Sequence, residues 1–455
     1  MSGNTIKMLW FSGRVRLKVW ASLLLVFLWV TVSVRQSIQW VALPVPLVDV
    51  SKQTDGASLT SKLSVQFEKA SELSQKWTPR VVENQDDLLT VDNCPPPHVT
   101  QQQGLHITLA TQLSADRFWL VEEACRRRWN VDPMVVVVYF ESSQELDRLS
   151  ANFIRRLEQA FCFHVHLIFY VDDRHKDEDN PKIYPINLLR NLALAQVRTS
   201  HVLMYDVDFL PSAHLEQHIR AAWQVRAGAR TATNTNRTRE ALVVPALQMG
   251  SSDGTNVSDY TKLTVPSSFR ELQICVNSGL CRIFDIVRGY GHSPTRTTLW
   301  LEKDWYLPIQ CQADQPLVND LRYVVCIPNR AYEPYVVLPW CSPGSGTRRT
   351  PYYDDRFVGY GLNKVQYILH LRYLGFLFWV MPEGFLIHVP HEITQWRESF
   401  MKDHTSMRGV FEMFSTELEE RHPWQRTNHR NCQHWQKNFA SRGFNESQAF
   451  CKAYV

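Results

Sequence analysis

Val202-Leu203-Met204-Tyr205-Asp206-Val207-Asp208-Phe209-Leu210-Pro211 is the stretch that decides how this chain is interpreted. Its first four residues form a short apolar run with turn residues beyond it, which predicts a buried strand. Asp206 and Asp208 stand one residue apart at the end of that strand. Carboxylates so placed converge on a divalent cation, and a hard cation there can clamp the diphosphate of a nucleotide. The stretch therefore predicts a metal-dependent transferase that acts on a nucleotide sugar.

A second acidic triplet, Asp177-Glu178-Asp179, lies in a polar run with no apolar strand before it. Because a chain this rich in Asp contains about one such triplet by chance, the motif alone is a weak signal. Context separates the two copies. We assign metal binding to Asp206 and Asp208 and interpret the second triplet as a solvated loop.

Apolar runs and amphipathic segments alternate along the chain from Leu105 onward. We expect strands at 106–110, 134–139, 164–170 and 202–205, and helices near 115–128, 144–161 and 185–198. Such alternation is typical of an α/β fold with a doubly wound, mostly parallel sheet and flanking helices. Ligands of these folds bind at the carboxyl ends of the strands, which is where Asp206 and Asp208 lie.

Length and composition fit an enzyme of ordinary construction. With 455 residues, 44% of them hydrophobic and 21% charged, the chain can bury a large core. The formal net charge of +4 is small and is not concentrated in a basic stripe. A nucleic-acid partner is therefore not expected.

The amino-terminal region predicts attachment to a membrane. Residues 19–34 form an apolar stretch with more Lys and Arg before it than after it, which favours a cytosolic amino terminus. We expect a cytosolic tail at 1–18, an uncleaved transmembrane anchor at 19–34, a stem at 35–103 and a lumenal catalytic domain at 104–455. A short helix is expected in the stem around 63–73. A cleaved signal peptide is the alternative, although no small-x-small site follows the apolar run.

Cysteines and glycosylation sequons indicate a secretory compartment. The ten Cys are even in number and show no Cys-x-x-Cys spacing, which favours lumenal disulfides over a zinc ribbon. Cys275 with Cys281, and Cys432 with Cys451, could close short loops. Three acceptor sequons begin at Asn236, Asn256 and Asn445. Together with the anchor, these features predict the endoplasmic reticulum or Golgi.

The helix expected before the Asp206 strand carries a polar face. Asn187, Arg190 and Asn191 are spaced so that they share one side, next to the expected diphosphate site. An Arg flanked by two amides is suited to binding phosphate or nucleotide. The alternative is that Arg190 pairs with a carboxylate while the Asn residues only cap or solvate.

Four ordered stretches of this chain resemble glycosyltransferase family 49. They are YPINLLRNLAL at 184–194, DVDFLP at 206–211, DDRFVGYGLNK at 354–364 and IHVPH at 387–391. That family includes the glucuronyltransferase domain of the LARGE-type glycosyltransferases and the related beta-1,4-glucuronyltransferase that acts on O-mannosyl glycans. A further stretch, TLATQLSADR at 108–117, is similar to the family's first strand and the turn after it.

The resemblance implies a GT-A fold, a UDP-sugar donor, Mn²⁺, inversion at the anomeric carbon and a glycan or glycoprotein acceptor. It also implies a single-pass type II protein of the Golgi membrane, and it places Thr111 and Gln112 near the uridine. Inserts at 227–240 and 250–259 and the basic loop at 342–350 differ from what the animal enzymes show. They bear on the acceptor rather than on the chemistry.

His388 and His391 are candidates to complete the metal site. Imidazole is an acceptable third ligand for manganese, and a His from a distant segment can close such a site. The alternative is a hydrogen-bonded His at a strand end. A zinc protease motif is not formed, because Pro390 breaks the helix that would place both histidines on one face.

An inverting transfer needs a base that takes the proton of the acceptor hydroxyl. Asp354 and Asp355 are the candidates, because they precede the loop Gly359-Tyr360-Gly361, which can bring backbone close to a sugar. One of them could simply pair with Arg356. Glu333 and Glu392 are the reserves.

Lys364 and a group of aromatic residues complete the list of candidates. Lys364 could meet a phosphate or the carboxylate of a glucuronyl donor, with a solvated lysine as the alternative. An acceptor cleft lined by aromatic rings is one interpretation of the following residues, and core packing is the other. They are Trp300, Trp305, Tyr306, Tyr332, Tyr335 and Trp340.

The sequence favours an inverting, metal-dependent transfer of glucuronic acid from a UDP-sugar to a glycan. Transfer of N-acetylglucosamine or xylose on the same fold is an alternative. A membrane-anchored glycan-binding protein without turnover is another, although such a protein has no need of the metal ligands Asp206 and Asp208.

Overall fold

The computed structural model describes thirteen stretches of the chain and one single residue. They are 63–69, 89–90, 105–129, 131–173, 183–233, 239–250, 264–284, 291–302, 322–324, 327, 331–341, 347–348, 350–391 and 405–423. These stretches belong to one compact unit, Ser61–Val455. The expected cytosolic tail and anchor, the second acidic triplet, the three sequons, Cys432, Cys451 and Glu392 lie outside the described residues. Within the described stretches, no helix has the length and apolar character needed to cross a membrane.

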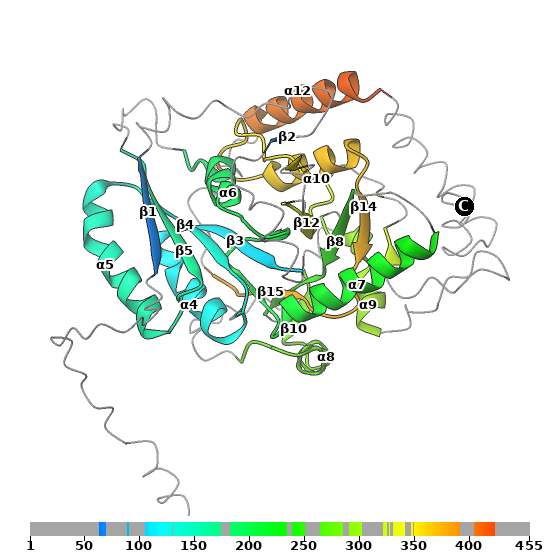
Figure 1. Cartoon of the computed structure of the whole chain (residues 1–455), viewed down its shortest axis with the longest axis horizontal. Helices are drawn as coiled ribbons and strands as arrows, with labels where there is room; N and C mark the ends of the chain where they lie inside the picture. Colours follow the sequence, from blue (N-terminus) through cyan, green and yellow to red (C-terminus); the bar gives the residue numbers. More distant parts are fainter. Residues whose placement is uncertain are drawn as a thin grey trace, which may run out of the picture. The chain divides into compact units, whose positions relative to one another are not determined.

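A nine-stranded sheet forms the centre of this unit (Figure 1), in the order β1-β5-β4-β3-β6-β12-β8-β14-β11. The strands in chain order are β1 (Ser64–Lys69), β3 (Ile107–Ser114), β4 (Met134–Phe140), β5 (Val165–Val171), β6 (His201–Met204), β8 (Glu240–Val244), β11 (Arg322–Tyr323), β12 (Tyr335–Pro339) and β14 (Leu377–Val380). From β1 to β6 all neighbours are parallel. β12 runs antiparallel to both β6 and β8, β14 is parallel to β8, and β11 is antiparallel to β14. The predicted α/β class with a mostly parallel sheet is confirmed, and the second half of the sheet is mixed.

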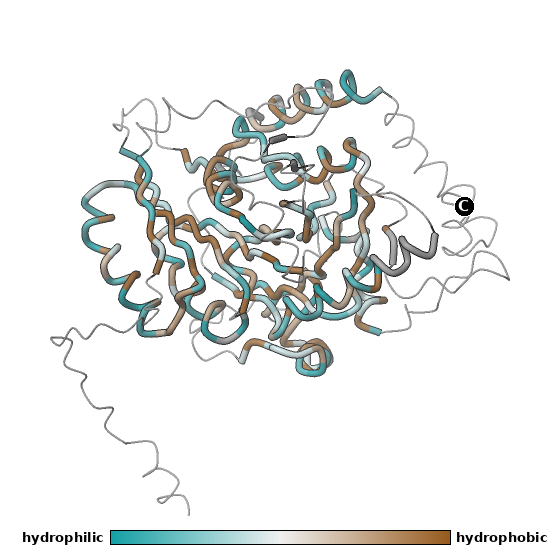
Figure 2. The backbone as a smooth tube through the Cα atoms, in the orientation of Figure 1, coloured by the Kyte–Doolittle hydropathy of each residue, from teal (hydrophilic) through white to brown (hydrophobic). Residues whose placement is uncertain are grey.

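The register of the central strands brings the ends of β3 and β6 and the start of β12 to one edge of the sheet. Ala110 of β3 lies beside Met204 of β6, so both strands reach the same edge of the sheet. Val337 of β12 lies beside Leu203 of β6 from the other side. Because β12 is antiparallel, its first residue, Tyr335, reaches the end of β6 where the acidic loop begins. The central strands β4 and β5 are almost wholly buried, and Figure 2 shows their hydrophobic residues in brown.

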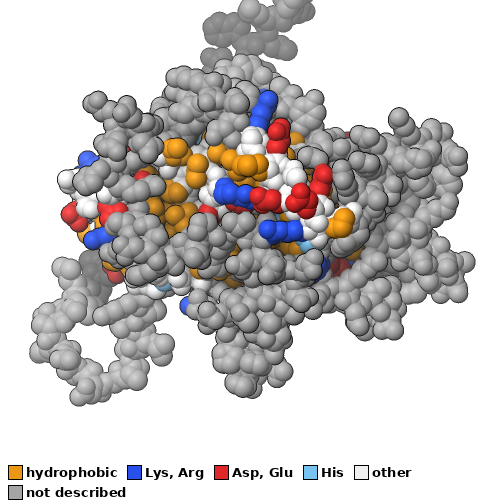
Figure 3. Space-filling view, turned by 90° about the horizontal axis from the view of Figure 1, so that it is seen from above, with side chains coloured by type: hydrophobic (Ala, Val, Ile, Leu, Met, Phe, Trp, Pro, Cys, Tyr) orange, Lys and Arg blue, Asp and Glu red, His pale blue; other side chains and the backbone are white. Residues whose placement is uncertain are grey.

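Helices cover both faces of the sheet (Figure 1). α6 (Ile186–Ala195) packs on β3, β4 and β6, and α10 (Asn363–Tyr373) lies on the same side with α12 (Thr405–Arg421) against it. On the other side lie α4 (Phe118–Arg127), α5 (Ser143–Gln159) and α7 (Leu215–Thr233). Seen from the α12 side, charged side chains of both signs lie beside hydrophobic ones (Figure 3). The helices expected near 115–128, 144–161 and 185–198 are confirmed within a few residues at each end.

Local signals set the helix boundaries. Ser142 caps α5, since its hydroxyl accepts a hydrogen bond from the amide of Glu145, three residues on. α5 turns Phe153 and Leu157 inward, and the Phe153 ring stacks on Phe118 with 3.9 Å between centroids. The cap fixes where α5 starts, and these two buried side chains fix which face it presents to the sheet.

A second sheet continues directly from the acidic loop. Its order is β10 (Cys281–Ile283), β9 (Ala246–Met249), β15 (Leu386–His388) and β7 (Phe209–Pro211). β7 starts immediately after Asp208, and β15 ends at His388, which lies opposite Phe209. This pairing carries a segment from far along the chain to the end of β6. A separate two-stranded pair joins β2 (Leu89–Thr90) to β13 (Thr347–Arg348).

The helix expected around 63–73 is wrong. Ser64–Lys69 forms strand β1, which pairs in parallel with β5, and Phe67 makes an edge contact with Phe169 at 5.5 Å. Val65 and Phe67 alternate with polar residues at the period of a strand, and this short signal was missed. The physical reason is the open edge of β5, whose backbone groups need partners. The segment assigned to the stem thus supplies a strand of the sheet.

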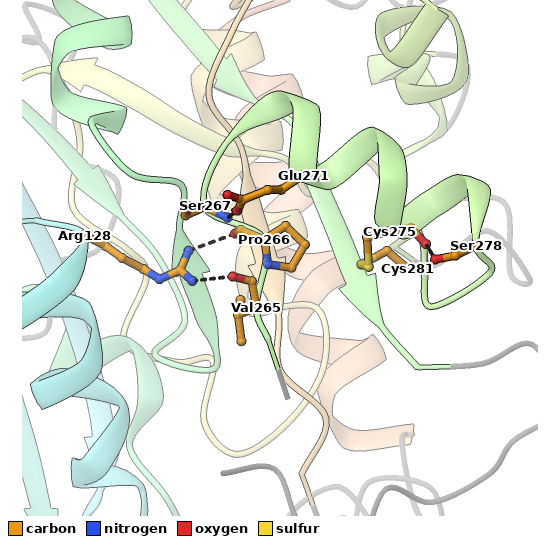
Figure 4. The surroundings of a disulfide bond; sticks show 8 residues. All are labelled: Arg128, Val265, Pro266, Ser267, Glu271, Cys275, Ser278 and Cys281. Carbon is orange, nitrogen blue, oxygen red and sulfur yellow. Dashed lines mark hydrogen bonds between the residues drawn. A yellow bond between two sulfur atoms is a disulfide. The ribbon is translucent and has the colours of Figure 1, made fainter. Parts of the chain in front are cut away.

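Two disulfides have both of their cysteines among the described residues, where no free cysteine is found. Cys125 of α4 is bonded to Cys162, and Cys275 is bonded to Cys281, as predicted. The second bond closes the end of α8 (Phe269–Asn277) onto β10. In the same region, Arg128 donates to the carbonyls of Val265 and Pro266 at 2.9 and 3.0 Å (Figure 4). It also donates to the carbonyl of Pro211 at 2.9 Å. This arginine fastens the end of β7 to the segment that leads into α8.

Candidate metal and nucleotide site

The acidic loop between β6 and β7 is fixed by its own backbone. Tyr205 donates its amide to the carbonyl of Ala110 at 3.0 Å, and Phe209 donates to the carbonyl of Asp206 at 2.9 Å. The hydroxyl of Thr111 donates to the carbonyl of Tyr205 at 2.9 Å. The side chain of Thr111 therefore holds the start of the acidic loop. The two carboxylates are held in separate directions and find different partners.

Asp206 is surrounded by donors from three elements, and we call Asp206, Arg190, Tyr335 and Lys364 the Asp206 cluster. Arg190 of α6 donates to its Oδ1 at 2.8 Å. Tyr335 of β12 and Lys364 of α10 each donate to its Oδ2 at 2.8 Å. Burial alone would raise the pKa of Asp206, but Lys364 and Arg190 lower it below its ordinary value. The carboxylate is therefore charged and fully engaged.

Arg190 donates its hydrogen bonds to other side chains of the protein. It is 1% exposed, and besides Asp206 it donates to the side-chain oxygens of Asn187 at 3.1 Å and Asn363 at 2.8 Å. Burial acts to lower its pKa, and the charge of Asp206 raises it above the ordinary value. The pairing of Arg190 with a carboxylate, which the sequence left as an alternative to phosphate binding, is what the structure shows.

Asp208, His388 and His391 converge, and we call them the Asp208 group. Nε2 of His391 lies 2.7 Å from Oδ2 of Asp208, and Nε2 of His388 lies 3.4 Å from the same oxygen. The amide of Val389 donates to the carbonyl of Asp208 at 2.8 Å and holds both histidines against the loop. One ligand atom from each residue lies within 4.8 Å of the others.

The Asp208 group fits a divalent cation. Metal–ligand bonds of about 2.2 Å place two ligands of one ion at most about 4.4 Å apart, so only a small adjustment is needed. Two imidazole nitrogens and a carboxylate oxygen suit manganese better than magnesium, which prefers oxygen. Burial would raise the pKa of Asp208, but hydrogen bonds from His388 and His391 hold it well below its ordinary value. Asp206 lies outside this group.

Aromatic rings hold His388 in place. Its imidazole lies 5.0 Å from the ring of Phe209 and 5.5 Å from that of Phe284, measured between centroids. His292 packs edge-on against Phe284 at 5.2 Å, and burial lowers its pKa to about 3. His292 is therefore a neutral imidazole that packs on the same phenylalanine ring, Phe284, as His388.

Arg117 was not among the site residues predicted from the sequence, although its guanidinium contacts two members of the Asp208 group. It ends the short 3-10 helix η1 (Ala115–Arg117) that follows β3. Its guanidinium lies 3.4 Å from Oδ2 of Asp208 and 3.1 Å from Nδ1 of His391. The only sequence signal was its place in the turn after the first strand.

Asn187 and Asn191 join α6 to the segment that carries the candidate bases. Asn187 donates to the carbonyl of Asp354 at 2.9 Å. Asn191 donates to the carbonyl of Tyr353 at 2.8 Å and accepts from its amide at 2.9 Å. Asn191 also donates to the carboxylate of Asp355. Both amides are fully buried, so they set the position of this segment.

The two candidate bases have different surroundings. Asp354 is 3% exposed and receives Arg356 through Nε at 3.0 Å and Nη2 at 2.6 Å. Arg356 in turn donates twice to Glu417 of α12 at 2.7 Å. Asp354 therefore anchors α12, which is the pairing with Arg356 that the sequence left open for one of the two. Asp355 is only partly buried.

The glycine loop before α10 takes backbone conformations that favour glycine. Gly359 and Gly361 have φ values of 66° and 92°, and Leu362, which precedes α10, has 57°. The amide of Gly359 donates to the carbonyl of Tyr184 at 2.7 Å. A left-handed non-glycine residue is strained, and such strain concentrates at functional sites. The loop delivers Lys364 to Asp206.

Gln112, the other residue expected near the uridine, is 7% exposed, and its side-chain oxygen Oε1 accepts a hydrogen bond from the hydroxyl of Tyr184. The aromatic residues offered as an acceptor cleft are core residues where they are described. Trp300, Tyr332, Tyr335 and Trp340 are at most 2% exposed. Trp305 and Tyr306 lie beyond the described stretches.

Comparison with protein families matches residues 171–423 to the family described as "Glycosyl-transferase for dystroglycan". The matched range holds the acidic loop, both histidines and the segment from Asp354 to Lys364. The chain is 32% identical over 313 residues to "Xylosyl- and glucuronyltransferase LARGE2" of Mus musculus, covering 67% of this chain and 37% of that protein. The protein of the same name from Homo sapiens is 32% identical over 302 residues, covering 64% and 34%. The chain thus spans about a third of the length of these relatives.

Among solved structures, the mannosyltransferase PcManGT from Pyrobaculum calidifontis, in complex with GDP-Man and Mn²⁺, is 11% identical. The match covers 80% of this chain and 81% of that one, with a TM-score of 0.32. A likeness at this TM-score carries no argument.

Proposed function

This chain belongs to glycosyltransferase family 49, and on that premise we propose that it moves a sugar from a UDP-sugar to a glycan or glycoprotein acceptor, using Mn²⁺ and inverting the anomeric carbon. The observation that carries the proposal is the Asp208 group. Asp208, His388 and His391 come from two distant segments and meet where the parallel strands end, the place at which such sheets bind their ligands. Glucuronic acid is the proposed donor sugar; the relatives are named xylosyl- and glucuronyltransferases, a name that covers both this sugar and xylose.

The residues of the site divide the work. Asp208, His388 and His391 would hold the cation, which when bound would stabilise the departing diphosphate. Asp206 holds the acidic loop in place through Arg190 and Tyr335. It would join the metal only by exchanging one of these donors or Lys364.

Lys364 is the donor-facing cation of this proposal. Its side chain is 16% exposed and its ammonium donates to Asp206, whereas the side chain of Arg190 is 2% exposed. Burial acts to lower the pKa of Lys364, and Asp206 raises it above the ordinary value, so the charge is retained. A phosphate or a glucuronyl carboxylate that enters beside Asp206 would meet this charge. A fixed positive charge at that point favours an acidic donor sugar.

Asp355 is the proposed base. Asp354 is tied to Arg356 and sits 3% exposed, whereas Asp355 is partly exposed and is oriented by Asn191. Asp355 would take the proton of the acceptor hydroxyl while that oxygen bonds to the anomeric carbon. The bond from that carbon to the UDP oxygen breaks in the same step, and UDP leaves.

The proposed place of this reaction is the Golgi lumen, with residues 19–34 as a type II anchor.

A donor screen with two matched variants tests the proposal. Purified protein is assayed with UDP-glucuronic acid, UDP-xylose and UDP-N-acetylglucosamine, with Mn²⁺ and with chelator, for hydrolysis and for transfer. We expect Mn²⁺-dependent turnover of UDP-glucuronic acid, about 100-fold slower in Asp355→Asn, since a general base contributes about that factor or more. Asp354→Asn should keep most of the turnover and lose stability.

The outcomes separate the alternatives. Turnover of UDP-xylose or UDP-N-acetylglucosamine alone would replace the donor assignment and leave the family chemistry intact. Glycan binding without turnover of any donor would show a binding protein. Asp354→Asn slower than Asp355→Asn would reverse the assignment of the base.

A further inference from the structure

The guanidinium of Arg117 lies against the atoms that would bind the cation. Its Nη1 lies 3.4 Å from Oδ2 of Asp208 and 3.3 Å from Nε2 of His391, and its Nη2 lies 3.1 Å from Nδ1 of the same ring. A positive guanidinium therefore rests on two of the three members of the Asp208 group. Its side chain is 15% exposed.

The hydrogen-bonding capacity of these groups limits how the protons are arranged. Nη1 and Nη2 of Arg117 lie beside Nε2 and Nδ1 of His391, so the guanidinium faces both ring nitrogens of the imidazole. A carboxylate only accepts, so Nε2 of His391, 2.7 Å from Asp208, carries the proton. While Nε2 donates to Asp208, it has no lone pair to offer to a metal.

A metal at the Asp208 group needs the opposite arrangement. Ligation through Nε2 of His391 requires that its proton lie on Nδ1. The charge of Arg117 also repels a divalent cation at Asp208. Arg117 and the cation therefore exclude each other from this place.

The surroundings of Arg117 leave it free to exchange partners. Its contact with Asp208 is long at 3.4 Å, and its other acidic neighbour, Asp116, is 3.9 Å away and 72% exposed. This differs from Arg190, which is enclosed by three short hydrogen bonds. A guanidinium recognises phosphate through two parallel hydrogen bonds, and the diphosphate of the donor would lie beside the cation.

We propose that Arg117 is an exchangeable positioning residue that neutralises Asp208 before the cation binds and turns to the donor diphosphate afterwards. This inference rests on the proposed function. Arg117 thereby opposes binding of the cation alone and favours binding of the nucleotide once the cation is present. The two bindings are coupled through one side chain.

The test measures binding rather than turnover. Mn²⁺ is titrated into the full-length protein without nucleotide, with free Mn²⁺ followed by electron paramagnetic resonance, and UDP is then titrated at saturating Mn²⁺ by calorimetry. In Arg117→Ala we expect about fivefold or more tighter Mn²⁺ binding and about fivefold or more weaker UDP binding, the range of ordinary coupling between sites. Arg126→Ala is the matched control, since Arg126 lies in α4 and is 48% exposed; it should change neither affinity.

Arg117→Lys keeps the inference testable if the alanine variant fails to fold. Lysine retains the charge but not the two parallel donors, so UDP should bind more weakly than in the wild type and Mn²⁺ should bind nearly as in the wild type. Mn²⁺ binding in Arg117→Ala that is no tighter than in the wild type would overturn the inference alone. Absence of Mn²⁺ binding in the wild-type protein would overturn the metal assignment and the inference together.

Discussion

Asp206 and Asp208 stand one residue apart, yet the structure gives them opposite kinds of surroundings. Asp206 accepts three short hydrogen bonds from an arginine, a tyrosine and a lysine. Asp208 faces two imidazoles and a long contact to Arg117. The partners of Asp206 are an arginine, a tyrosine and a lysine, and none of these is a metal ligand in the Asp208 group. The partners of Asp208 are themselves metal ligands.

The difference shows that two similar carboxylates can do different work. The Asp206 cluster joins α6, β12 and α10 to the acidic loop, so its contribution is to position that loop. The Asp208 group joins the loop to β15 with side chains that can all turn to one cation. We therefore expect loss of Asp206 to act mainly on stability and loss of Asp208 mainly on activity.

The largest expected effect is that of Asp208→Asn. Removing the charge that holds the cation against the diphosphate should slow Mn²⁺-dependent transfer by about 1000-fold, or about 4 kcal/mol of transition-state stabilisation. Because Asp208 borders the site and is not a partner of Arg190, the variant should unfold near the wild-type temperature. Initial rates and thermal unfolding measure both. Near-normal turnover would place the metal elsewhere.

Asp206→Asn should affect stability instead. It leaves the buried charge of Arg190 without its carboxylate, and breaking a buried pair costs about 3 kcal/mol of the free energy of unfolding. Chemical denaturation measures this loss. The Mn²⁺ concentration for half-maximal activity should stay within about twofold of the wild type in the folded fraction, since this is within the usual spread for a residue that does not bind the ligand. A large rise in that concentration would make Asp206 a direct ligand and remove the contrast with Asp208.

His388→Ala and His391→Ala come next. Each removes one nitrogen ligand, so the Mn²⁺ concentration for half-maximal activity should rise about tenfold or more, with a smaller change at saturating Mn²⁺. His292→Ala is the control, because it lies behind the group and is not among the three that meet. If only one of the two histidine variants shifts the Mn²⁺ dependence, the other is a hydrogen-bonded residue of the strand end.

The sequence predicted the parts of the fold that rest on local signals. β4 is an uninterrupted apolar run that is buried along its whole length, and Ser142 caps α5 within its own first turn. Both are readable from neighbouring residues. β1 was missed because it alternates over only a few residues and gains its stability from the distant strand β5.

The same limit applied to the site. The Asp-x-Asp motif at a strand end and the His-x-Pro-His stretch predicted a metal group, and the structure brings Asp208, His388 and His391 together. Tyr335 and Arg117 were not predicted as partners, because β12 inserts beside β6 only in the folded sheet and a single arginine after a strand is a common feature. Which carboxylate each would meet depends on strand order, which no local pattern encodes.

The smallest expected effect sharpens the contrast at the Asp206 cluster. Tyr335→Phe keeps the buried ring and removes the hydroxyl that donates to Asp206 at 2.8 Å and accepts from Lys364 at 3.0 Å. Lys364 still donates to the same oxygen, so the free energy of unfolding should fall by only about 1 kcal/mol. Chemical denaturation measures this value.

Tyr332→Phe is the matched control for that change. Its hydroxyl, which lies 3.0 Å from Thr295, is equally buried but has no contact with the acidic loop. Both variants should therefore lose similar stability, while only Tyr335→Phe should alter the KM for the UDP-sugar, by about twofold to threefold, because Lys364 loses one of its two partners. A shift in Mn²⁺ dependence as large as that of the histidine variants would show instead that Asp206 shares the cation with Asp208. In that case the two carboxylates would form one site, and the division of work between them would be wrong.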